Sequence, residues 1–114
     1  MKASDRYFVN GVTCIMGDHE MRVANLSVGG LFAATDDDPP MEGQFVSLQL
    51  RLGPRPPFTV QGKVTWINQP SNPKAHDLPK GFGIKITKIE FPDKLAILDM
   101  LKRSADHPSR LSSE

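Results

Sequence analysis

Asn25-Leu26-Ser27-Val28-Gly29-Gly30 is the stretch that decides the fold, because it joins two runs of strand-like sequence. Residues 20–27 partly alternate between polar and apolar, and a short apolar run, 31–34, leaves the stretch. In an extended backbone the side chains of Asn25 and Ser27 point to the same side. The two glycines then permit a tight reversal with positive φ and leave no Cβ in the way of a ligand. The stretch therefore predicts a turn that places two polar side chains beside glycine backbone. Such a turn can form hydrogen bonds with the edge of a nucleotide base.

The same stretch also has a purely structural interpretation. Asn, Ser and Gly dominate turns for local reasons, so Asn-x-Ser-x-Gly-Gly can be a turn and nothing more. Short motifs of this kind carry little weight by themselves. The surrounding sequence has to decide between a turn and a binding site.

Strand-like runs recur along the chain at the spacing expected of an all-β barrel or sandwich. The predicted strands are residues 8–16, 20–27, 31–35, 44–52, 58–67 and 82–87. The run 44–52 alternates most clearly between polar and apolar residues. Gly62 lies in the middle of the fifth run, where we expect a bulge or a bend. The longest irregular segment, 68–80, holds three prolines, and loops of this length are commonly mobile or functional.

The last part of the chain reads as a helix followed by a polar tail. Pro92 suits the first position of a helix, and leucines recur every third residue over 93–104. The apolar face of this helix has to be covered, most simply by the end of a barrel or by a partner. We expect one domain over residues 1–104 and a polar tail over 105–114.

Length and charge limit the function classes. A chain of 114 residues can bury one compact core, and it is too short for two domains. Its 14 Lys and Arg against 13 Asp and Glu give a net charge of +1, whereas proteins that bind nucleic acid usually carry a strong basic excess. Near-neutrality still allows a small ligand with two phosphates. No apolar run approaches the ~20 residues of a membrane span, and residues 1–6 do not lead into a signal-peptide core, so we expect a cytoplasmic protein.

Catalytic and metal-binding constellations are not recognisable in the sequence. Cys14 is the only cysteine, which excludes an internal disulfide, and its strand-like surroundings predict a buried, inert thiol. The three histidines, His19, His76 and His107, stand apart without ligand spacing, so we expect them on the surface and no metal site. No nucleophile, base and orienting residue can be combined, and we therefore expect no enzyme activity.

Several stretches match one known family. Asn25, Ser27 and Gly30 occupy a signature Asp/Asn-x-Ser-x-x-Gly in register, and residues 62–66 and 80–86 look like two strands of the same family. On these residues the chain resembles the PilZ domain, the bacterial module known for binding the second messenger cyclic di-GMP. The resemblance covers nearly the whole sequence. It implies a six-stranded antiparallel PilZ-type β-barrel with a C-terminal α-helix.

The family's other signature, Arg-x-x-x-Arg, lies just before the first strand, where two guanidinium groups wrap the ligand. Here the segment is Lys2-Ala3-Ser4-Asp5-Arg6, so Arg6 matches the second arginine and Lys2 stands at the first. A guanidinium binds phosphate oxygens in pairs and stacks on guanine, whereas an ammonium acts on phosphate as a point charge. Asn25 in place of Asp offers one oxygen acceptor to a guanine edge. These departures predict binding weakened by about 1–3 kcal/mol if one charge-assisted contact is lost.

The resemblance and the residues together predict a nucleotide site made of Lys2, Arg6, Asn25, Ser27, Gly29, Gly30 and Trp66. In this site Arg6, assisted by Lys2, clamps phosphate and guanine, while Asn25, Ser27 and Gly30 meet the other base edge. Trp66 has two interpretations. It stacks on a base at the outer face of the barrel, or it lies in the core, since it falls in phase with Val64.

Three functions stay open at this point. The first is a cytoplasmic receptor for cyclic di-GMP that relays ligand level to a downstream protein in motility, biofilm or polysaccharide control. The second is a protein-interaction module on the same fold that no longer binds the dinucleotide, which Lys2 favours. The third is a small barrel for single-stranded nucleic acid, although eight aromatic residues and a near-neutral charge count against stacking platforms.

Overall fold

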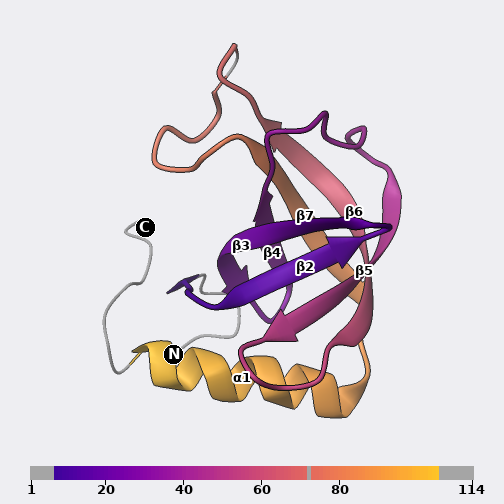
Figure 1. Cartoon of the computed structure of the whole chain (residues 1–114), viewed down its shortest axis with the longest axis vertical. Helices are drawn as coiled ribbons and strands as arrows, with labels where there is room; N and C mark the ends of the chain where they lie inside the picture. The colour runs from indigo at the N-terminus through magenta and orange to yellow at the C-terminus, as the bar shows by residue number, and fades with distance from the viewer. Residues whose placement is uncertain (1–6, 72, 106–114) are drawn as a thin grey trace.

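Alternating apolar residues build the strands of a barrel, and one helix follows them in the computed structural model, which describes residues 7–71 and 73–105. The strands are β1 (Tyr7–Phe8), β2 (Val12–Met16), β3 (His19–Ser27), β4 (Gly30–Ala34), β5 (Phe45–Leu52), β6 (Phe58–Asn68) and β7 (Gly81–Lys88). The helix α1 spans Phe91–Ala105. Figure 1 shows the strands wrapped around one another and α1 lying across one end of the barrel. Lys2 and Arg6 of the predicted site, His107 and nearly all of the predicted tail lie outside the described residues.

The sheet closes on itself through antiparallel pairings. The strand order is β1-β3-β2-β5-β6-β7-β4, and β3 also pairs with β4, so β2 to β7 form a closed ring of six strands. The short β1 pairs with the second half of β3, where Tyr7 lies opposite Leu26. The predicted six-stranded antiparallel barrel with a C-terminal helix is confirmed.

One predicted strand is interrupted. Residues 8–16 were expected to form a single strand, but residues 9–11 make a bend that separates β1 from β2. Gly11 adopts a φ of 75°, which L side chains rarely tolerate. Asn10 before it is a residue that turns favour, so the local Asn-Gly pair outweighs the apolar character of the run. The prediction of one strand is therefore wrong.

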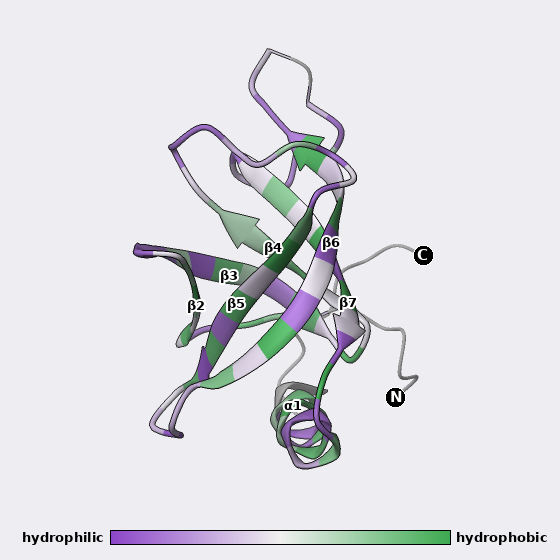
Figure 2. Cartoon of the chain, turned by 90° about the vertical axis from the view of Figure 1, so that its right-hand side faces the viewer, coloured by the Kyte–Doolittle hydropathy of each residue, from purple (hydrophilic) through white to green (hydrophobic). Residues whose placement is uncertain are grey.

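The interior of the barrel is filled by apolar side chains. Figure 2 shows hydrophilic and hydrophobic residues alternating along β5 and β6, as expected for strands with one face inside. Fully buried residues of the core include Val23, Leu26, Leu31, Leu48, Leu50, Val60, Val64, Phe82 and Ile84. Helix α1 adds Ala96, Ile97 and Leu101 to the same core. In the described part of the chain, no helix has the length and apolar character needed to cross a bilayer.

The bulge predicted at Gly62 is present. The register between β6 and β7 shifts between Gln61 and Gly62. A Cβ on Gly62 would lie 2.7 Å from the carbonyl oxygen of Lys85, closer than real Cβ atoms approach. Glycine is therefore the residue that lets β6 and β7 pass this closely.

The long loop after β6 is organised by one side chain. Asn68 is 3% exposed, and its amide Nδ2 donates to the carbonyl oxygens of Ala75, Leu78 and Pro79 at 3.0–3.1 Å. Its Oδ1 accepts from the backbone amides of Lys74 and Ala75 at 2.8 and 3.0 Å. Among the described residues, these bonds hold residues 74–79 of the loop onto the end of β6.

Candidate functional site

A β-bulge turns Trp66 to the outer face of the barrel. The pairing of β6 with β7 shifts between Val64 and Trp66, so that Val64 lies opposite Ile84 and Trp66 opposite Gly83. Val64 and Ile84 are buried in the core, whereas Trp66 is partly exposed and lies outside the core cluster. An extra residue in one strand reverses the alternation beyond it. The interpretation of Trp66 as a core residue in phase with Val64 is therefore wrong.

A second bulge does the same for Asn25. The pairing of β3 with β4 shifts between Val23 and Asn25, which places Asn25 opposite Phe32. Val23 and Leu26, on either side of the shift, both belong to the core cluster, so Asn25 beside Leu26 faces the other way. On its other side, Asn25 pairs with Phe8 of β1. The two predicted site residues that lie furthest apart in the described sequence thus share the outer face.

The pairings align these residues in one row across five strands. The row consists of Phe8, Asn25, Phe32, Gly83 and Trp66, from β1, β3, β4, β7 and β6. The rings of Phe32 and Trp66 meet at a centroid distance of 5.2 Å and an angle of 40°. Trp66 lies over Gly83, where an added Cβ would clash with the indole. With strands about 4.8 Å apart, the backbones of Asn25 and Trp66 are roughly 14 Å from each other.

Asn25 carries an unusual polar group. The residue is 1% exposed, and its Oδ1 has no hydrogen-bond partner among residues 7–71 and 73–105. A buried acceptor without a partner costs about 1–3 kcal/mol, and native proteins contain few of them. Such a group needs an explanation, and a ligand that donates a hydrogen bond supplies one.

Ser27 fastens the turn that follows β3. Its hydroxyl donates to the carbonyl oxygen of Gly30 at 3.3 Å and accepts from the backbone amide of Gly29 at 3.2 Å. The expected positive φ at the two glycines is wrong, since the described residues with positive φ are Gly11, Gly17, Gly43 and Gly53. At Gly29 the missing side chain matters for space instead. A Cβ there would meet no atom within 4 Å, so the turn is open on that side.

A second row of outward residues runs beside the first. Ser27 pairs with Gly30, Gly30 with Lys85, Lys85 with Lys63, and Lys63 with Phe45. The sequence reasoning missed the two lysines. The alternation of Phe82, Ile84 and Ile86 around Lys85 was a usable signal that Lys85 faces outward. Its pairing with Lys63 depends on long-range register, which no local pattern shows.

A cavity opens beside the signature turn. It measures 730 Å³ and lies between that turn, the end of β7 and the start of α1. Its lining includes Gly29, Phe91, Lys88 and Lys94. Of the predicted site residues that the structure describes, Gly29 is the one that contributes to it.

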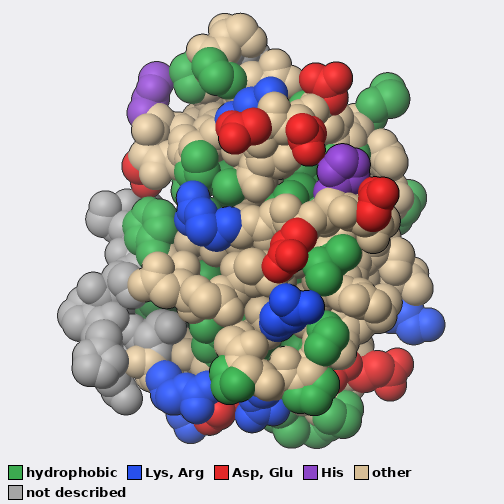
Figure 3. All heavy atoms as spheres, viewed as in Figure 1, with side chains coloured by type: hydrophobic (Ala, Val, Ile, Leu, Met, Phe, Trp, Pro, Cys, Tyr) green, Lys and Arg blue, Asp and Glu red, His purple; other side chains and the backbone are tan. Residues whose placement is uncertain are grey.

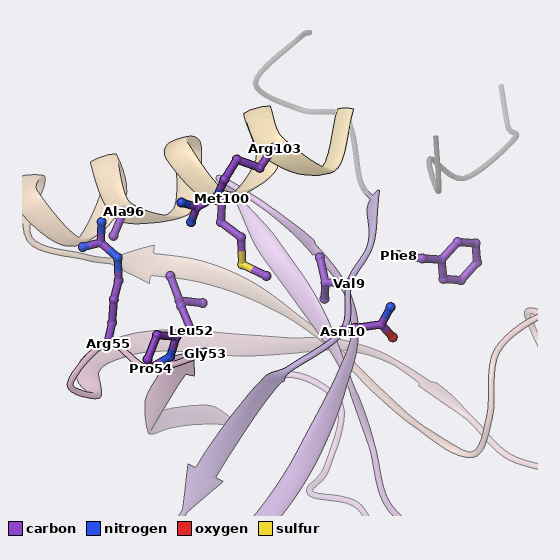
Figure 4. Close-up of a pocket in the computed structure, with 10 residues that line it drawn as sticks. All are labelled: Phe8, Val9, Asn10, Leu52, Gly53, Pro54, Arg55, Ala96, Met100 and Arg103. Carbon is purple, nitrogen blue, oxygen red and sulfur yellow. The ribbon is translucent and has the colours of Figure 1, made fainter. Parts of the chain in front are cut away.

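A separate cavity of 340 Å³ lies between α1 and the turn after β5. Figure 4 shows Arg55 and Arg103 approaching it from these two elements, with Phe8 pointing away. The two guanidinium groups share the carboxylate of Asp99 at 3.9 and 3.4 Å, so their charge is partly neutralised. Figure 3 shows Lys and Arg side chains along the same edge of the molecule, where α1 lies. None of the predicted site residues within 7–71 and 73–105 lines this cavity.

The remaining titratable side chains of interest are His19, Asp37 and Cys14. Within the described ranges, no cluster of three or more His, Cys, Asp or Glu residues could hold a metal ion. His19 is exposed and lies 3.3 Å from a carboxylate oxygen of Asp37. Cys14 is buried, as predicted, and this burial raises the pKa of its thiol to about 12. The thiol is therefore protonated at neutral pH.

Comparison with known proteins gives a family and a fold. A family model described as PilZ domain matches residues 4–103. The structure is similar to that of the inhibitor of motility MotI/DgrA from Bacillus subtilis, with a TM-score of 0.71 at 17% identity. The likeness covers 94% of this chain and 53% of the Bacillus protein, so the chain spans about half of that protein's length. An uncharacterized Legionella protein, Lpg0364, has a TM-score of 0.56 at 16% identity, over 89% of this chain and 94% of its own. No match was found among curated proteins.

Proposed function

Because this chain belongs to the PilZ domain family of cyclic di-GMP receptor and adaptor domains, we propose that it binds cyclic di-GMP on the outer face of its barrel. One observation carries the proposal. The buried Oδ1 of Asn25 has no partner within the described residues, and it lies in the signature of the family, in one row with Trp66. A guanine edge, which presents N–H donors side by side, is the kind of group that this acceptor can bind.

The short strand β1 follows the basic segment in the sequence and pairs beside the signature turn. Arg6 directly precedes Tyr7 in the sequence, and Tyr7 pairs with Leu26, the neighbour of Ser27. Arg6 takes the phosphate and guanine contacts, because a guanidinium can fork on phosphate oxygens and stack on a base. Lys2 assists as a point charge. Ligand capture then orders this segment against the barrel.

Trp66 provides the stacking surface at the other end of the row. Its indole is partly exposed, and it is supported from below by the bare backbone of Gly83 and from the side by Phe32. Stacking of a base on an aromatic side chain is worth about 1–3 kcal/mol and needs no base-specific hydrogen bond. Asn25 then supplies the specificity, and Gly29 and Gly30 leave room at the turn.

Ligand binding changes the surface of the domain, and a downstream protein recognises the changed surface. The printed title of the Bacillus structure calls that protein an inhibitor of motility, and its likeness to this chain shows the fold. On this basis we assign the chain to the control of motility, biofilm or polysaccharide production in the cytoplasm. The proposal needs a protein partner and neither nucleic acid nor a metal ion.

Titration calorimetry with cyclic di-GMP tests the proposal. The wild-type protein should give saturable heat with a dissociation constant in the micromolar range, as expected of about −8 kcal/mol. Arg6→Ala and Asn25→Leu should each weaken binding about tenfold or more, which is the loss of one charge-assisted or buried hydrogen bond. Arg22→Ala, an exposed cation on β3, is the matched control and should bind as the wild type does. No heat at tens of micromolar protein, or unchanged binding by Arg6→Ala, rejects the proposal.

A second function is favoured by the hydroxyl of Ser27. Its donor and one of its two acceptor sites are already used within the turn, so Ser27 has a structural role without any ligand. A PilZ-type interaction module that ignores the dinucleotide would look the same here. It predicts a folded protein that captures a motility, polysaccharide or chemotaxis component equally well with and without cyclic di-GMP.

A further inference from the structure

We propose that Lys85 and Lys63 form the phosphate-binding part of this outer-face site, although neither belongs to a signature of the family. The inference rests on the proposed function and names the charged half of the same site. It starts from the second outward row, in which Ser27, Gly30, Lys85 and Lys63 follow one another across β3, β4, β7 and β6.

The two lysines form an unfavourable pair in the absence of a ligand. They lie directly opposite each other on neighbouring strands, both exposed, and neither has an ion-pair partner among the described residues. Like charges opposite each other destabilise a sheet. The ammonium of Lys63 lies 5.5 Å from the ring centroid of Phe45, a side chain that is 71% exposed. A bound anion between the two ammonium groups would turn this repulsion into attraction.

The position of the pair relative to the first row indicates what the anion is. Along β3, β4 and β7 the two rows are two residues apart, which is about 7 Å, and on β6 the bulge makes the separation three residues. A nucleotide laid across both rows would place its phosphate beside Lys85 and its base against the partly exposed indole of Trp66. Gly30, directly opposite Lys85, has no side chain that could fill this space. The chemistry is therefore that of a phosphodiester joined to a base.

The lysine pair adds positive charge to a site whose preceding segment, before β1, offers one ammonium and one guanidinium. With Lys2 at the position of the first arginine, that segment has one guanidinium in place of two. Two further ammonium groups on paired strands add positive charge at fixed backbone positions. As point charges they act on phosphate without forking or stacking. We therefore expect them to contribute affinity that depends strongly on salt.

The test measures cyclic di-GMP binding by calorimetry for Lys85→Gln, Lys63→Gln and the double variant, at low and high salt. Lys85→Gln should weaken binding about tenfold, and Lys63→Gln, one strand further from Gly30, about threefold. Both should also reduce the dependence of affinity on salt. The control Arg22→Gln removes one charge five residues before Ser27 on β3, roughly 17 Å away, which exceeds the Debye length of about 8 Å at 0.15 M salt. It should bind as the wild type does.

A stability measurement separates a binding role from a folding role. Because each substitution removes a repulsion, the ligand-free variants should melt at the wild-type temperature or above it. Weaker binding with unchanged or raised melting temperature supports the inference. A lowered melting temperature in the ligand-free lysine variants overturns it, and so does wild-type affinity in the double variant while Arg6→Ala is impaired. If the wild-type protein itself binds no cyclic di-GMP, the proposed function fails and takes this inference with it.

Discussion

Replacing Gly83 with alanine tests whether Trp66 lies on the outer face of the barrel. An added Cβ would lie 2.8 Å from Cε2 of the indole and closer still to Nε1 and Cδ1, within the range that real Cβ atoms avoid. The indole must then move away by roughly an ångström, which is overpacking and costs about 1–3 kcal/mol. It also loses part of its contact with Phe32, a ring pair worth about 1 kcal/mol.

The expected loss of stability is thus about 2–4 kcal/mol. In a domain of this size each kcal/mol lowers the melting temperature by roughly 4–8 °C, so the shift should reach about 10 °C or more. Trp66 is the only tryptophan of the chain, and its fluorescence therefore reports on this contact alone. Gly83→Ala should shift the emission maximum to the red as the indole moves toward water, and should lower the midpoint of denaturant unfolding.

Gly29→Ala is the matched control for this experiment. Its φ is not positive, and an added Cβ would meet nothing within 4 Å. We expect its stability to change by less than about 0.5 kcal/mol, as is usual for open surface positions. If Trp66 pointed into the core, Gly83→Ala would leave it untouched. Wild-type emission and a wild-type midpoint in Gly83→Ala would therefore refute the outward placement of Trp66.

Three further predictions concern stability. Phe32→Ala should cost about 3–5 kcal/mol in denaturant unfolding, because its ring is fully buried, whereas Phe45→Ala, at an exposed position, should stay close to the wild type. Cys14 makes stability fall above pH 9: the unfolded thiol ionises near its ordinary pKa of 9.0 while the folded thiol, with a pKa of about 12, keeps its proton. This loss should reach about 1.4 kcal/mol at pH 10, and the difference between wild type and Cys14→Ala in chemical unfolding at pH 7 and pH 10 measures it. Asn68→Ala removes the hydrogen bonds that hold residues 74–79, so amide hydrogen exchange and protease cleavage of this loop should rise several-fold while those of the barrel strands stay unchanged.

The barrel could be predicted from the sequence because its strands have one buried face. Residues 44–52 and 82–87 alternate between polar and apolar, and the structure places β5 and β7 within a residue of these limits. The bulge at Gly62 was predictable as well, since a glycine inside a strand marks a close backbone approach. The break after Phe8 had a signal in the Asn-Gly pair, which the apolar residues around it concealed.

The site was harder to predict because it depends on pairing between distant strands. The bulge before Trp66 contains no glycine, so nothing in the local sequence shows that the alternation reverses between Val64 and Trp66. Likewise, Lys63 and Lys85 are 22 positions apart, and only the register of β6 and β7 sets them opposite each other. The register of each strand pair is set by the requirement that the whole sheet buries one face. The pattern within a single segment carries no information about which residue of another strand lies opposite.

The closed barrel itself explains why binding groups gather on its outside. A ring of six strands leaves room for its own side chains, and the inward positions are already occupied by residues such as Leu31, Leu50 and Ile84. Polar groups placed there would lose hydrogen bonds with water and gain none. The two bulges place Asn25 and Trp66 outside while the residues around them stay in the core. The core can therefore stabilise the fold, while the outer rows carry two opposed lysines and an amide oxygen without a partner among the described residues.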